Sequence, residues 1–129
     1  MFMIRRTARG RQPRVVAIRK LYRMFSQENT SEARGLRLLR SWLSAEQRQD
    51  FDQKGYFDVL GCDSRTRYRI RYGTAMNVHE LDELGNFRMG WCFVPDGSLV
   101  AGDVMLAQKI ALETSEYAAL AVAKRFLAR

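Results

Sequence analysis

The sequence has few of the residues that build metal centres, disulfide frameworks and membrane spans. Its 129 residues include two cysteines, Cys62 and Cys92, and one histidine, His79. Two cysteines without CxxC spacing and a single histidine argue against the common zinc sites, which need four ligands. No run approaches the ~18 apolar residues that a membrane helix needs. We therefore expect no metal or other cofactor and a reducing, cytoplasmic setting.

Acidic residues are missing from the first 27 positions, because the first carboxylate is Glu28. The same stretch carries eight cations: Arg5, Arg6, Arg9, Arg11, Arg14, Arg19, Lys20 and Arg23. The chain has 22 Lys and Arg against 14 Asp and Glu, so the rest of it is neutral and the net charge of +8 belongs to this arm. Such an arm favours nucleic acid, anionic lipid headgroups or an acidic partner. An Arg-rich segment without acids is also typical of an organellar transit peptide.

Apolar residues in the second half of the arm follow a helical period. Val15, Ile18, Tyr22 and Phe25 are spaced by three or four residues. This spacing predicts a basic amphipathic helix over residues 14–26. We divide the chain into an arm with its amphipathic helix, residues 1–27, and a single α+β domain, residues 28–129.

Three further helices are predicted in the domain. One begins at Ser31, and the next begins at Ser44, where Gln47 completes a capping-box pattern. A long C-terminal helix is capped by Asp103 and continues its apolar stripe through Phe126 and Leu127, with a possible kink or new cap at Thr114–Glu116. On this helix Glu113 and Glu116 are expected on a solvated face, with Lys109 pairing with Glu113.

Between these helices the period falls to two, which is typical of half-buried strands. Strands are predicted around residues 56–61, 65–72, 76–79 and 87–93, separated by tight turns. Short strands joined in this way favour an antiparallel meander. The expected fold class is therefore α+β, with N-terminal helices, a four-stranded antiparallel meander and a long C-terminal helix packed on one face of the sheet.

The second predicted strand alternates arginine with apolar or small residues. If Tyr68, Ile70 and Tyr72 face the core, the opposite face carries Arg65, Arg67, Arg69 and Arg71 at a spacing of roughly 7 Å. This spacing is close to the phosphate repeat of a nucleic-acid strand, and arginine binds phosphate in a bidentate manner. Asn77, His79, Arg88 and Cys92 are expected on the same face. The alternative is an ordinary solvated face whose arginines pair with Asp58, Glu80 or other acids.

Catalytic signals are weak. The sequence has no Gly-rich phosphate loop, no GxSxG elbow and no HExxH helix. Cys92 is a conceivable nucleophile beside His79, but a lone exposed histidine and two free thiols explain these residues equally well. We therefore predict no catalytic residue and no metal ligand.

Three segments carry a resemblance: Arg69–Gly73, Asn77–Asp82, and Gly102–Glu113 together with Glu116. Across about two-thirds of its length the chain resembles a group of small hypothetical proteins from bacteria and phages. The resemblance implies a bacterial source, which argues against a transit peptide. It implies no activity and no site residue.

The leading hypothesis is a non-enzymatic binding module. It would contact nucleic acid or a nucleoprotein assembly through the arm, Arg5 to Arg23, and through the arginine strand. A second hypothesis is a protein-interaction subunit that docks through the amphipathic helix 14–26. A third is a small enzyme that uses Cys92 or His79.

Overall fold

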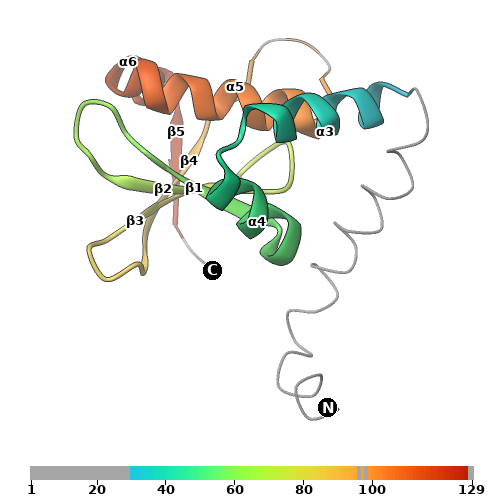
Figure 1. Ribbon diagram of the computed structural model, residues 1–129. Helices are drawn as coiled ribbons and strands as arrows, with labels where there is room; N and C mark the ends of the chain where they lie inside the picture. Colours follow the sequence, from blue (N-terminus) through green and yellow to red (C-terminus); the bar gives the residue numbers. More distant parts are fainter. Residues whose placement is uncertain (1–29, 96, 98, 128–129) are drawn as a thin grey trace, which may run out of the picture.

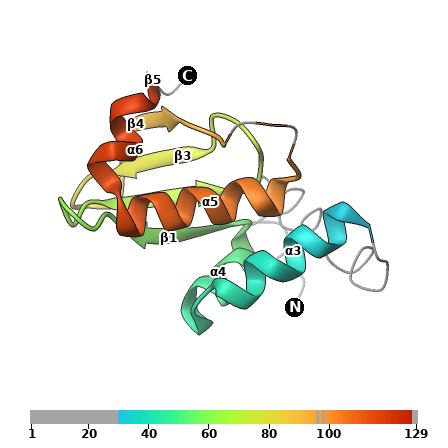
Figure 2. The ribbon, with the colours of Figure 1, turned by 90° about the horizontal axis from the view of Figure 1, so that it is seen from above.

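A computed structural model describes residues 30–95, 97 and 99–127 (Figure 1). The predicted arm and the amphipathic helix over residues 14–26 lie outside the described residues. The fold is α+β, as predicted, with helices on one side of an antiparallel sheet (Figures 1 and 2). The elements run in the order α3 (Ser31–Trp42), α4 (Ala45–Lys54), β1 (Tyr56–Leu60), β2 (Arg67–Arg71), β3 (Val78–Leu81), β4 (Phe87–Cys92), α5 (Ala101–Thr114), α6 (Glu116–Val122) and β5 (Lys124–Phe126).

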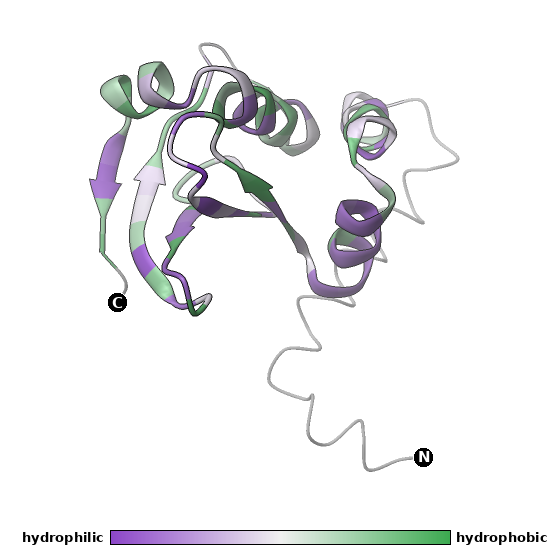
Figure 3. Ribbon diagram, turned by 60° about the vertical axis from the view of Figure 1, so that its left-hand side comes forward, coloured by the Kyte–Doolittle hydropathy of each residue, from purple (hydrophilic) through white to green (hydrophobic). Residues whose placement is uncertain are grey.

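The first two described helices begin at side-chain caps. Thr30, one residue before the predicted cap, accepts a hydrogen bond from the backbone N–H of Ala33 and starts α3. Ser44 and Gln47 form the predicted capping box of α4, with both reciprocal hydrogen bonds present. Helix α4 ends at Gly55, which adopts the left-handed conformation that glycine tolerates best. In Figure 3, α4 is coloured hydrophilic over most of its length.

The sheet has five strands in the order β1-β2-β3-β4-β5, all antiparallel, so the prediction of four strands is wrong by one. The first four strands form the predicted meander. The fifth, β5, comes from residues for which the sequence predicted continued helix. The chain becomes extended at Ala123, and Phe126 then pairs with Gly90 of β4. This pairing with a distant strand outweighs the local apolar stripe.

The long C-terminal helix of the expected fold is divided in two, and the break lies within Thr114–Glu116, where the sequence predicted a kink or a new cap. The backbone leaves the helical region at Ser115, where φ is −151° and ψ is 50°. The first N–H groups of α6 are then satisfied from the turn after β1: Asp63 accepts from Tyr117, and the sulfur of Cys62 accepts from Glu116. Helix α5 starts at the cap residue Val100, and Asp103 lies in its first turn rather than at the cap.

The core lies between the sheet and α5. Phe57 and Val59 from β1 and Tyr68 and Ile70 from β2 are buried beneath the helices, together with Met105 of α5. Helix α3 packs against α5 and completes this layer, while α4 contacts β1 (Figure 2). The opposite face of β1 and β2 is therefore directed away from the helical layer.

Candidate nucleic-acid interface

The sheet face that points away from α5 carries the arginines of β2. Arg67, Arg69 and Arg71 alternate with the buried Tyr68 and Ile70. The strand register and the alternation along each strand place residues of the other four strands on this same face. We call it the outer face and define it by Tyr56, Asp58, Leu60, Arg67, Arg69, Arg71, His79, Leu81, Phe87, Gly90, Cys92, Lys124 and Phe126.

One transverse row crosses the whole outer face. Asp58 of β1 is paired in register with Arg69 of β2, and Arg69 with His79 of β3. His79 is paired with Gly90 of β4, and Gly90 with Phe126 of β5. The row therefore runs from a carboxylate through an arginine and a histidine to an aromatic ring.

Arg69 is held tightly in this row. Its Nε and Nη2 donate to the two carboxylate oxygens of Asp58 at 2.8 and 3.1 Å, which is a bidentate pair. Its guanidinium carbon also lies 4.0 Å from the ring centroid of Tyr56. The hydrogen bond to Asp58 raises the pKa of Arg69 above its ordinary value. For Arg69, the alternative of a paired, solvated sheet face is what the geometry shows.

Arg67 is the most open of the three arginines. Its side chain is 45% exposed, and its nearest carboxylate oxygen, on Asp58, is 3.8 Å away. It lines two open hollows, one of about 610 Å³ beside α4 and one of about 480 Å³ beside the β3–β4 turn. Arg67 therefore borders open space on two sides, and its ion pair with Asp58 is a long one.

Arg71 lies at the other end of β2. Its guanidinium is 5.2 Å from the centroid of Tyr56, and its Nε donates to Nδ1 of His79 at 3.3 Å. Tyr56 is thus covered by two arginines, and Nζ of Lys54 lies 5.9 Å from the centroid of the same ring. These contacts hold the cations side by side on the face.

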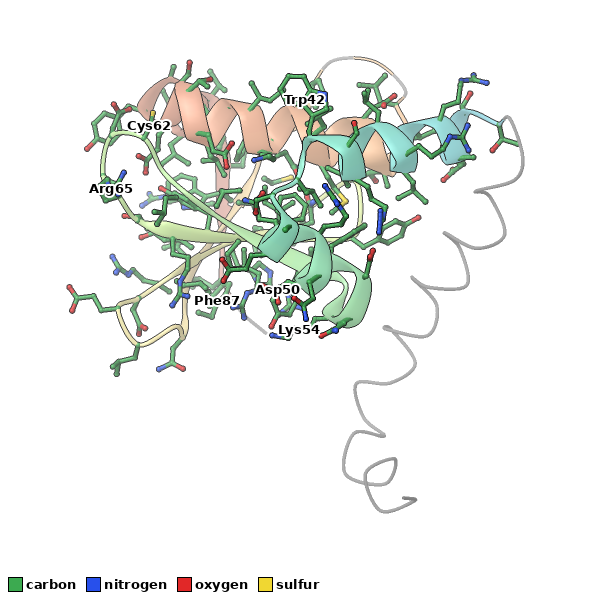
Figure 4. The ribbon with its side chains drawn as sticks, viewed as in Figure 1. Trp42, Asp50, Lys54, Cys62, Arg65 and Phe87 are labelled. Atoms are coloured by element: carbon green, nitrogen blue, oxygen red, sulfur yellow. The ribbon has the colours of Figure 1, made fainter. Side chains whose placement is uncertain are left out.

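Arg65 is not part of the strand, which corrects the predicted run of four arginines. It lies in the turn before β2 with φ of 64°, and its N–H donates to the carbonyl of Gly61. Figure 4 shows Arg65 at the end of the β1–β2 connection, away from Asp50, Lys54 and Phe87. It shares the smaller hollow with Arg67 and Arg88.

Two residues expected on the outer face have other partners. Asn77 is buried and exchanges hydrogen bonds with Gln108 of α5, so its side chain faces the helical layer. Arg88 pairs with Glu80 at 3.2 Å, as the alternative of acid pairing anticipated. The register shifts between Glu80 and Leu81, and this irregularity breaks the alternation on which the prediction for Arg88 depended.

Sequence reasoning missed an aromatic group on the outer face. The ring centroids of His79 and Phe87 are 5.0 Å apart, and those of His79 and Phe126 are 6.0 Å apart. Phe87 is labelled in Figure 4 on the side of the sheet opposite α5. Simple alternation along β4 would place Phe87 on the same side as Trp91, which packs against the core, and the register shift between β3 and β4 reverses this. No local signal identified Phe126, because it belongs to the unpredicted strand β5.

Sequence reasoning also missed the burial of Glu116, which is 0% exposed rather than solvated. Its carboxylate accepts hydrogen bonds from the backbone N–H groups of Asp63 and Ser64 and from the hydroxyls of Ser64 and Tyr68. Burial opposes its ionisation, but these hydrogen bonds outweigh burial and lower the pKa of Glu116. Burial and the adjacent carboxylate raise the pKa of Tyr68, so its hydroxyl remains a donor. The arrangement is a structural anchor with every oxygen satisfied.

The candidate catalytic residues gain no further support. Cys62 and Cys92 are both free thiols. Cys92 and His79 share the outer face as expected, but Nδ1 of His79 accepts from Arg71. Within the described part of the chain, no group of three or more His, Cys, Asp or Glu side chains could hold a metal ion. The catalytic hypothesis stays a prediction.

Comparisons with known proteins give no match, whether to a family model, to a curated protein or to a solved structure. Among the helices that the structure describes, none is long and apolar enough to cross a membrane. The functional argument therefore depends on the outer face itself.

Proposed function

We propose that this protein is a non-enzymatic binding module for nucleic acid, or for a nucleoprotein surface, with two cationic contacts. The first is the arm with its eight basic residues and no acid. The second is the outer face. The observation that carries the proposal is the alignment of Arg67, Arg69 and Arg71 along one strand, on the face directed away from the helical layer.

The charge on the outer face favours an anion. Its strand residues include four cationic side chains, the three arginines of β2 and Lys124, and one carboxylate, Asp58. Asp58 is already engaged with Arg69, so it does not fully neutralise Arg67, which lies 3.8 Å from it. Arg69 is held by Asp58, and the arginines on either side of it, Arg67 and Arg71, are four residues apart on the strand, roughly 14 Å, which is about two phosphate repeats.

Charge removal tests this proposal. We expect Arg67→Gln to weaken binding of a mixed-sequence RNA roughly 2- to 10-fold and to lower the slope of log affinity against log salt by about one. The measurement is fluorescence anisotropy between about 50 and 200 mM salt. The full-length chain with its eight arm cations changed to glutamine should lose most of the slope.

Arg34→Gln is the matched control, because it removes the same charge from the exposed surface of α3, in the helical layer. The slope of log affinity against log salt should fall less in Arg34→Gln than in Arg67→Gln. Equal effects of the two substitutions would show that only total charge matters. An affinity that changes neither with salt concentration nor with the arm substitutions would contradict the proposal.

A further inference from the structure

Three aromatic side chains occupy the part of the outer face farthest from β1. His79 of β3, Phe87 of β4 and Phe126 of β5 form a continuous group, with ring centroids 5.0 to 6.5 Å apart. None of the three is fully buried. They lie away from the core beneath α5, so their apolar area is not needed to close that core.

Phe126 lies over the backbone of Gly90. A Cβ at position 90 would come within 2.5 Å of three different atoms of the Phe126 ring, so the ring covers this glycine with its face. A side chain on residue 90 would lift the ring off the sheet. The glycine therefore lets the ring pack closely on β4, and Phe126 stays half-buried rather than fully buried.

The aromatic group borders the cations directly. His79 is the register partner of Arg69 and accepts a hydrogen bond from Arg71. Tyr56, the aromatic residue on the β1 side, is in contrast covered by the guanidinium of Arg69 at 4.0 Å and is not free to stack. The face thus has cations at its centre and stacking surfaces at one end.

Nucleotides combine the two groups that such a face can bind. Phosphates pair with guanidinium groups, and bases stack on aromatic side chains with little sequence preference. In a duplex the faces of the bases are stacked on one another and cannot reach an aromatic ring. In a single strand they can.

We propose that the outer face binds single-stranded nucleic acid, with a base stacked on Phe126 and other phosphates of the same strand beside Arg67 and Arg71. This inference rests on the proposed function and narrows its ligand. It assigns Phe126 and Gly90 a binding role in addition to their part in the β4–β5 pair. It predicts that binding has a component that salt does not remove, because stacking does not depend on counterion release.

The test compares labelled single strands of about 12 nucleotides, as RNA and as DNA, with the same sequences as duplexes. The protein is the full chain, as wild type and as Phe126→Leu, which keeps an apolar side chain over Gly90 but removes the aromatic ring. We expect at least one single strand to bind more tightly than its duplex. Phe126→Leu should weaken that binding roughly 5- to 100-fold and leave duplex binding unchanged.

Tyr117→Leu is the matched control, because it removes an aromatic ring that is 62% exposed on α6. It should bind like wild type. Phe126→Trp keeps a stacking ring and should retain affinity, with its added tryptophan fluorescence quenched by the single strand. This second variant keeps the proposal testable if Phe126→Leu does not fold.

The outcomes separate this inference from the proposed function. If single strand and duplex bind equally and Phe126→Leu changes neither, while the salt slope still depends on the arm and Arg67, the stacking inference is wrong and the electrostatic proposal stands. If the salt slope is absent as well, both are wrong.

Discussion

Arg65 adopts a left-handed backbone conformation, with φ of 64°, in the turn between β1 and β2. For a residue with a Cβ this region costs roughly 1–2 kcal/mol, whereas asparagine and glycine enter it more easily. Gly61 fixes the turn through two backbone hydrogen bonds. Its carbonyl accepts from the N–H of Arg65, and its N–H donates to the carbonyl of Thr66. The surrounding turn therefore imposes the conformation, and the arginine side chain gains its position from it.

Replacing Arg65 tests this conformation. Arg65→Asn should leave the free energy of unfolding unchanged or raise it by up to about 1 kcal/mol, because asparagine tolerates positive φ. Arg65→Val should lower it by about 1 kcal/mol or more, because a β-branched residue does not. Urea denaturation of the two variants measures the difference. Equal stabilities would mean that residue 65 is not left-handed in solution.

At the scale of elements, the contact between α3 and α5 depends on two glycines. A Cβ on Gly102 would lie 2.3 Å from the backbone carbon of Gly35, and one on Gly35 would lie 2.7 Å from the side chain of Val100. The two helix backbones therefore touch at this point. Sequence periodicity indicated both helices but carried no sign that they cross so closely.

Gly102→Ala distinguishes a backbone contact from ordinary helix packing. On an isolated helix this substitution is stabilising by about 1 kcal/mol, because alanine is the better helix former. Here it should instead destabilise the protein by roughly 1–3 kcal/mol, because the added methyl group forces α3 and α5 apart. Thermal or urea unfolding measures whether the substitution raises or lowers the free energy of unfolding. A stabilised variant would contradict the close approach.

The elements that sequence predicted well are those with local determinants. The capping box of α4 and the alternation of β2 are both present, because each depends on residues a few positions apart. The strand is shorter than predicted at its start, since the turn holds Arg65 outside it. Strand β5 was missed because its three residues are extended only by pairing with β4.

At the scale of the whole molecule, Glu116 ties the C-terminal half of the chain to the sheet. It comes directly after the break between α5 and α6 and binds the turn after β1 and the hydroxyl of Tyr68. A Cβ on Gly61 would lie 2.2 Å from the carboxyl carbon of Glu116, so glycine at 61 gives the carboxylate room. This one carboxylate therefore connects segments 48 to 53 residues apart.

The lowered pKa of Glu116 predicts how stability changes with pH. The folded state favours the ionised form, so its stabilisation is present above the unfolded pKa of about 4.5 and is lost as pH falls through the lower folded pKa. The glutamine side chain of Glu116→Gln does not titrate. It should be less stable than wild type by about 1–3 kcal/mol near neutral pH, and the gap should narrow at acid pH.

Denaturant unfolding at neutral pH and near pH 3 measures this gap. Glu46→Gln, an exposed carboxylate in the first turn of α4, is the control and should behave like wild type at both pH values. A gap between wild type and Glu116→Gln that stays constant with pH would show that the pKa of Glu116 is the same in the folded and unfolded states, which contradicts the prediction.

The sequence by itself determined the α+β class, most element positions and the separation of charge between the arm and a neutral domain. These follow from composition and from periods of two and about 3.6 residues, which each short stretch carries on its own. Only the tertiary structure decided that Glu116 is buried, that β5 exists, and that His79, Phe87 and Phe126 meet. Each of these depends on register and on contacts between segments far apart in the chain, and no local pattern encodes them.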